Sequence, residues 1–188
     1  MTVCRLLLSF GILGSFLFAC GGEEASIDAT GLTPEQRLKQ AQILVDQNEL
    51  TDAAGYLTSL VDSEGLSESL RTKALFGAAI CQAKMGSGTG LKRRLDRLEE
   101  AAPEGLDAAF YVGLGQQLLH AKSIGAARDT VARGKLRYPA EEAAFEKIDN
   151  DLALLAKAGD SIKALESLGY IGAKKGGPAG IDVASYWN

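Results

Sequence analysis

Few side chains in this chain could carry out chemistry. Among 188 residues there is one histidine, His120, and there are three cysteines, Cys4, Cys20 and Cys81. One imidazole cannot complete a zinc site without further ligands, and no catalytic-triad signature accompanies it. Cys81 is flanked by Ile80 and Gln82 in an expected helix, which predicts a buried structural thiol. We therefore expect no metal, no cofactor and no enzymatic activity.

Two further patterns could bind or transfer charged groups. The stretch GSGTGLKRR, residues 86–94, places glycines before basic residues, an arrangement that could hold an anion at a helix N-terminus. A phosphate-binding loop needs Gly-Lys-Ser/Thr after a strand, whereas this stretch follows a helical pattern over Ala74–Met85 and reads as a turn. Adjacent carboxylates such as Glu99 and Glu100 point in different directions on a helix. They indicate a solvated surface rather than a general acid and base.

Cys20 stands at the end of an apolar run. Arg5 is followed by the thirteen residues Leu6–Phe18, which carry no charge, and then by Ala19 and Cys20. A helix of that length rises about 20 Å, short of the hydrocarbon core of about 30 Å, so a spanning helix is disfavoured. A basic start, a short apolar run and small residues are typical of a secretory signal. We expect residues 1–19 to be this signal.

The four residues Leu17-Phe18-Ala19-Cys20 resemble the lipobox of bacterial lipoproteins, although Phe18 is bulkier than the residue usual there. The resemblance implies that the thiol of Cys20 receives diacylglycerol, with further acylation (palmitate) after cleavage. Gly21 is not the aspartate that retains such proteins at the inner membrane. An outer-membrane anchor facing the periplasm is therefore implied. The alternatives are ordinary secretion with cleavage after Gly21 and an uncleaved signal that is retained as a membrane anchor.

The segment after the signal is small, polar and acidic. Residues 20–32 have no helical period and read as a flexible tether. Without Arg5 the formal net charge moves from −4 to −5, and no basic patch indicates a nucleic-acid partner. If Cys20 is acylated, Cys81 has no partner for an intramolecular disulfide.

The rest of the chain predicts an all-α fold. Ala, Leu, Glu, Lys and Gln dominate residues 33–171, and no alternating strand pattern is sustained. Thr33 begins a capped helix with proline at its first position, and Asn48, Gly86 and Gly159 stand where helices should stop. Residues 172–188 are glycine-rich and predict a mobile tail, although Trp187 could dock back or reach a partner.

A repeat pattern runs through residues 33–171. Its clearest copy is Tyr111-x2-Leu114-Gly115-x2-Leu118, Ala127-x3-Val131-x2-Gly134 and then Pro139, which resembles the tetratricopeptide repeat (TPR). Weaker copies align on Ala53, Leu91 and Ala164, with spacings of 38, 36 and 37 residues. The resemblance implies a solenoid of about four helical hairpins, in which Gly115 and Ala127 let two helices cross closely. The alternative is an irregular helical bundle.

The TPR resemblance also implies a concave groove lined by the first helix of each hairpin. Carried over by phase, the expected partner-binding residues are Lys73, Phe76, Ile80, Lys84, Val112, Gln116, Leu119 and His120. Their mixed apolar and cationic character suits an extended or helical peptide with an acidic group. Some of them would instead pack against the next helix.

Two classes of function follow. One is a lipid-anchored scaffold for protein–protein interaction in the bacterial cell envelope. The other is a non-catalytic accessory module for an envelope or secreted hydrolase, because ALESLGYIG, residues 164–172, is similar to a short stretch of some bacterial sulfatases with TPR regions. The sulfatase nucleophile motif is absent from the sequence. The sequence leaves the partner's identity and the oligomeric state open.

Overall fold

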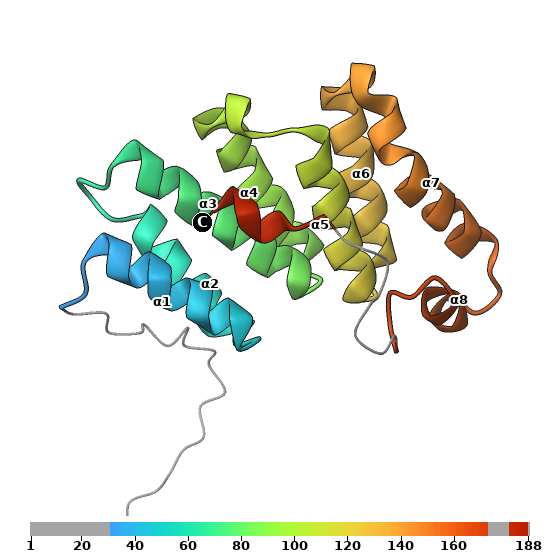
Figure 1. Ribbon diagram of the computed structural model, residues 1–188, viewed down its shortest axis with the longest axis horizontal. Coiled ribbons are helices and arrows are strands. Elements are labelled where there is room, and N and C mark those ends of the chain that lie inside the picture. The colour runs from blue at the N-terminus through green and yellow to red at the C-terminus, as the bar shows by residue number, and fades with distance from the viewer. Residues whose placement is uncertain (1–30, 173–180, 188) are drawn as a thin grey trace, which may run out of the picture.

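The computed structural model describes residues 31–172 and 181–187 and shows an all-α fold (Figure 1). No strand occurs within these described ranges. The expected signal 1–19, Cys20 and all but the last two residues of the expected tether lie outside them. The α-helices are α1 (Pro34–Asp46), α2 (Leu50–Val61), α3 (Glu68–Lys84), α4 (Gly88–Ala101), α5 (Ala108–His120), α6 (Ile124–Arg137), α7 (Glu142–Lys157) and α8 (Ser161–Ser167). Three short 3-10 helices are η1 (Pro103–Gly105), η2 (Pro139–Glu141) and η3 (Val183–Tyr186).

Successive helices pair into hairpins through turns of equal length. The connections 47–49, 85–87, 121–123 and 158–160 each have three residues. In the first three turns the middle residue is left-handed: Asn48 has φ 63°, Gly86 72° and Lys122 62°. These three residues follow one another at 38 and 36 residues, which are the spacings of the predicted repeat. The three turns therefore share one backbone geometry.

The same register holds inside the hairpins. Ala53, Leu91, Ala127 and Ala164 are each the fourth residue of the second helix of their hairpin. A Cβ atom at Gly115 would lie 2.9 Å from Cγ2 of Val131 and 2.8 Å from Cδ1 of Ile148. Because real Cβ atoms are not found so close to other atoms, a larger residue at this crossing would force Val131 of α6 and Ile148 of α7 to shift.

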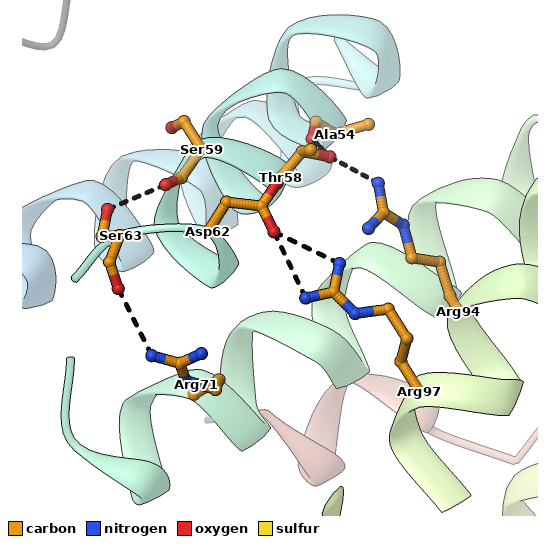
Figure 2. Close-up of polar contacts among 8 residues, drawn as sticks. All are labelled: Ala54, Thr58, Ser59, Asp62, Ser63, Arg71, Arg94 and Arg97. Atoms are coloured by element: carbon orange, nitrogen blue, oxygen red, sulfur yellow. Dashed lines mark hydrogen bonds and ion pairs between the residues drawn. The ribbon is translucent and has the colours of Figure 1, made fainter. Parts of the chain in front are cut away.

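Neighbouring hairpins pack through both of their helices: α2 lies along α3, and both α5 and α6 contact α7. α3 contacts both α1 and α5, and α5 contacts α7, while α4 contacts α6 (Figure 1). Figure 2 shows the polar contacts where the first two hairpins meet. Arg97 pairs with Asp62 at 3.2 Å, and Arg94 donates to Oγ1 of Thr58 at 2.7 Å. The Arg97–Asp62 pair is half-exposed, and such pairs contribute only about 0–1 kcal/mol, so apolar burial supplies most of the stability here.

A more buried polar cluster joins three helices around Glu99 of α4. Its carboxylate accepts hydrogen bonds from the hydroxyl of Tyr111 on α5 and from Nε of Arg133 on α6, the latter at 2.7 Å. Arg137 lies 3.4 Å from the other carboxylate oxygen. Burial acts to raise the pKa of Glu99, but the two hydrogen bonds and the two arginine charges outweigh it and hold the pKa below its usual value.

Glu99→Gln tests whether this cluster contributes to stability. Because the carboxyl pKa is lowered by folding, its contribution is complete above the ordinary value of 4.5 and is lost as the pH falls through the lowered folded value. We expect the variant to be less stable by about 1–3 kcal/mol at pH 7, and the difference to shrink below pH 4.5. Urea unfolding across pH measures this. Asp62→Asn, at the exposed pair, should cost about 0.5 kcal/mol or less.

Lys122→Gly tests the left-handed turn. A lysine with φ 62° carries a steric cost that glycine does not, and the gain is partly offset by the greater freedom of glycine in the unfolded chain. We expect the variant to be more stable by about 0.5–1 kcal/mol in urea unfolding. Asn48→Gly in the equivalent turn should gain less, because asparagine tolerates this conformation. Equal gains at both positions would contradict the steric explanation.

Candidate functional site

The groove residues expected from the sequence come together on α3 and α5, but most of them are covered. Lys73, Lys84 and His120 remain partly exposed. The other five are buried: Phe76, Ile80, Val112, Gln116 and Leu119. Part of the cover is the chain's own C-terminal segment, residues 181–187, which carries η3 and crosses α3 and α5 (Figure 1).

This docked segment differs from the expected mobile tail over 172–188. Within residues 181–187, the side chain of Trp187 is only 2% exposed and that of Val183 only 3%. The glycine-rich residues that led to the expectation are mostly 173–180, which lie outside the described ranges together with residue 188. Residues 181–187 therefore lie docked against residues distant in sequence, which is the alternative that the sequence left open for Trp187.

Two glycines in helix interiors leave hollows that side chains of this segment fill. A Cβ atom at Gly77 of α3 would lie 2.1 Å from Cε3 of Trp187, so the indole occupies the space that any larger residue would need. A Cβ atom at Gly113 of α5 would lie 2.3 Å from Cγ1 of Val183. Gly77 and Gly113 are 36 residues apart, the spacing between the second and third hairpins. Equivalent positions of α3 and α5 therefore each provide a hollow for one apolar side chain.

An aromatic cluster holds Tyr186 against α3 and α5. Its ring is stacked with Phe76, 5.7 Å between centroids, and lies 4.8 Å from the ring of Phe110. Its hydroxyl donates to Oδ1 of Asp107 at 2.6 Å. Burial, and then the hydrogen bond and charge of Asp107, raise the pKa of Tyr186. At neutral pH the hydroxyl therefore keeps its proton and remains a donor.

Two glutamines hold the main chain of the segment near its ends. Oε1 of Gln116 on α5 accepts a hydrogen bond from the amide of Ile181 at 3.0 Å. Nε2 of Gln42 on α1 donates to the carbonyl of Trp187 at 3.2 Å. Gln42, Ile80 and Gln116 follow one another at 38 and 36 residues and so occupy equivalent positions of the first three hairpins. One repeated position thus contributes a main-chain contact at each end of the docked segment.

His120 has a structural contact of a different kind. Its Nδ1 lies 2.6 Å from the carbonyl oxygen of Tyr170, in the turn that follows α8. The hydroxyl of Tyr170 donates to Asp151 at 2.7 Å, and Asp151 also pairs with Lys147 at 3.2 Å. The tyrosine of the sulfatase-like stretch, and with it Leu165, is therefore part of the core that packs the fourth hairpin onto the third.

The structure gives no support to thiol chemistry at Cys81. The side chain is fully buried, and this burial raises the pKa of the thiol to about 12, although the charge of Lys84 acts in the opposite direction. A thiolate is the reactive form of cysteine, so this thiol is inert near neutral pH. In the ranges 31–172 and 181–187, His, Cys, Asp and Glu side chains form no cluster suited to a metal ion. None of the helices in those ranges combines the length and apolarity needed to cross a membrane.

Sequence reasoning missed several residues that build this site. Gln42, Gly77, Asp107, Phe110 and Gly113 all touch the docked segment or make room for it. The usable signal was a pair of glycines, Gly77 and Gly113, each in a helix interior and separated by the repeat spacing. Glycine there costs about 1 kcal/mol relative to alanine, so a repeated one indicates a close approach.

Comparison with known proteins adds no relative: no family model, no curated protein and no solved structure matches the chain. The site is therefore interpreted from its own geometry.

Gly77→Ala tests the seat of Trp187, which is the only tryptophan in the chain. The added methyl would occupy the position of the indole ring, so we expect the segment to leave and the emission of Trp187 to shift to the red. The helices themselves should not be destabilised, because alanine favours helix by about 1 kcal/mol.

The matched control is Gly125→Ala. Gly125 lies in α6, and a Cβ atom there would meet nothing within 4 Å. This variant adds the same methyl group in the first turn of α6 and should leave the Trp187 emission unchanged. An unchanged emission in Gly77→Ala would contradict the docking of the indole on α3.

Proposed function

We propose that this chain is a membrane-anchored lipoprotein that acts as a TPR-type scaffold for protein–protein interaction in the bacterial cell envelope. One observation carries the proposal: the face formed by α1, α3 and α5 holds a seven-residue segment through hollows for side chains and hydrogen bonds to main chain. These are the two means by which proteins recognise short peptides, with hydrogen bonds giving affinity and pockets giving specificity.

The repeated geometry supports the TPR-like part of the proposal. Three turns of one conformation, and small residues recurring where helices cross, are what a stack of similar hairpins requires. In such an array each first helix adds an equivalent set of side chains to one continuous face. Gln42 and Gln116 are an example, since both bind main chain from the same repeated position.

A binding role agrees better with the described residues than a catalytic one. Cys81 is buried with a raised thiol pKa, and His120 is engaged by the Tyr170 carbonyl. The accessory-module alternative rests on residues 164–172, whose Leu165 and Tyr170 have packing roles. We therefore favour a scaffold without its own catalytic activity, with a protein or peptide as its partner.

The anchor part of the proposal rests on Cys20 and its preceding residues. Several acyl chains would hold the protein stably on a membrane, where one chain alone is marginal. Expressed in a bacterial host with a lipoprotein pathway, the wild-type chain should yield a mature form that starts at acylated Cys20. Cys20→Ser should lose the acyl mass and leave the membrane fraction. Intact-mass spectrometry measures both, and an unmodified start at Gly22 in both chains would contradict the anchor.

The scaffold part is tested by photo-crosslinking in cells. A photoreactive amino acid at Gln42 would lie beside the groove, and one at Leu136, which is 86% exposed on α6, serves as a matched surface control. We expect Gln42 to yield a discrete heavier adduct with another envelope protein, absent at Leu136. Adducts of the same masses from both positions, or none from Gln42, would count against a partner at this face.

A further inference from the structure

We propose that residues 181–187 are a built-in competitor for the groove, and that its external partner is a protein segment of the same chemistry. That chemistry is a β-branched aliphatic residue followed three and four positions later by two adjacent aromatic residues, the first of which carries a hydroxyl. This inference rests on the proposed scaffold function and names the kind of partner for the same face.

The first support is that the hollows are formed by the helices and not by the segment. Gly77 and Gly113 lie within α3 and α5, whose other residues are packed in the helical array. Interior glycines weaken a helix. Here Trp187 fills the space at Gly77, and Val183 together with Ile181 fills the space at Gly113. Helix positions that remain open when a segment leaves can accept another segment with matching side chains.

The second support is that the contacts select side chains by position. The three anchors Val183, Tyr186 and Trp187 stand at i, i+3 and i+4, and η3 turns all three toward the helices. Asp107 accepts a hydrogen bond from the tyrosine hydroxyl, so a carboxylate at this position would meet a like charge. The expected acidic group in the partner is therefore disfavoured at the tyrosine position, and an aromatic hydroxyl is favoured.

The third support is that the hydrogen bonds to the main chain of the segment do not depend on its side chains. Gln116 binds the amide of Ile181 and Gln42 binds the carbonyl of Trp187, so any segment of this length and turn offers the same groups. Asp182 and Ser185 of the segment are exposed. Oδ1 of Asp182 also accepts a hydrogen bond from the amide of Ala184 at 3.0 Å and so caps η3. A partner should therefore keep a capping side chain at the Asp182 position, whereas the residue at the Ser185 position is free to vary.

An occupant tethered to its own groove acts as a competitor at high effective concentration. An external segment binds only the fraction of molecules in which the groove is open, so its apparent affinity falls by that fraction. Loss of the internal anchors should therefore strengthen external binding, which a purely structural role for the segment does not predict.

The test uses the full chain with Cys20→Ser and a fluorescein-labelled peptide with the sequence of residues 181–188. Binding is measured by anisotropy to this chain and to the same chain carrying Tyr186→Ala and Trp187→Ala. We expect at least about tenfold tighter binding to the variant whose internal anchors are removed. Adding Gly113→Ala to that variant should weaken binding at least about tenfold, with circular dichroism showing that the helices are retained.

Three results would overturn the inference. One is no binding to the anchor-less variant while its helical signal is intact. Another is equal binding with and without the internal anchors. The third is a concentration-dependent dimer of the chain with intact anchors in size-exclusion chromatography, because the occupant would then be a second copy. A Gln42 photo-adduct obtained alongside any of these would leave the scaffold function standing and reject only the competitor.

Discussion

A single helical hairpin cannot bury both of its apolar faces, and in this chain each hairpin depends on its neighbours for the missing cover. Small residues set how closely the helices approach: at Gly115 of α5, a Cβ atom would lie 2.9 Å from Cγ2 of Val131 on α6 and 2.8 Å from Cδ1 of Ile148 on α7. In the stack of hairpins, equivalent residues fall into rows across the helices. The row of Gln42, Ile80 and Gln116 and the row of Gly77 and Gly113 are consequences of this packing, and the groove is made from them.

The groove combines helices of the core with the short docked segment that fills it. The helices that carry the two glycines are buried in the common core, and a cluster around Glu99 joins α4, α5 and α6. The segment that fills the groove contributes one short 3-10 turn and a few anchoring side chains. Ordering a short segment costs conformational entropy comparable to the gain from burying such anchors. A balance of this kind would suit the exchange of occupants that we propose.

Local sequence patterns predicted the helices well but not the docked segment. Capping residues, helix formers and the position of Asn48 and Gly86 are local signals, and the structure has helix ends where they place them. The contacts of residues 181–187 join groups 65 and 145 positions apart in the chain, which no local pattern encodes. His120 shows the same limit. The helical period predicted the side of the helix on which it lies, but not its contact with the carbonyl oxygen of Tyr170.

The two interior glycines also set a conflict between stability and recognition. With the segment docked, alanine at either position would displace a buried side chain, but once the segment has left it would strengthen the helix by about 1 kcal/mol. A laboratory screen for stability of the open form would therefore favour filling both hollows. Such variants would keep the helical array and lose the shape that receives a side chain. For this chain, the stability of the open helices and the hollows that receive Trp187 and Val183 therefore pull the sequence in opposite directions.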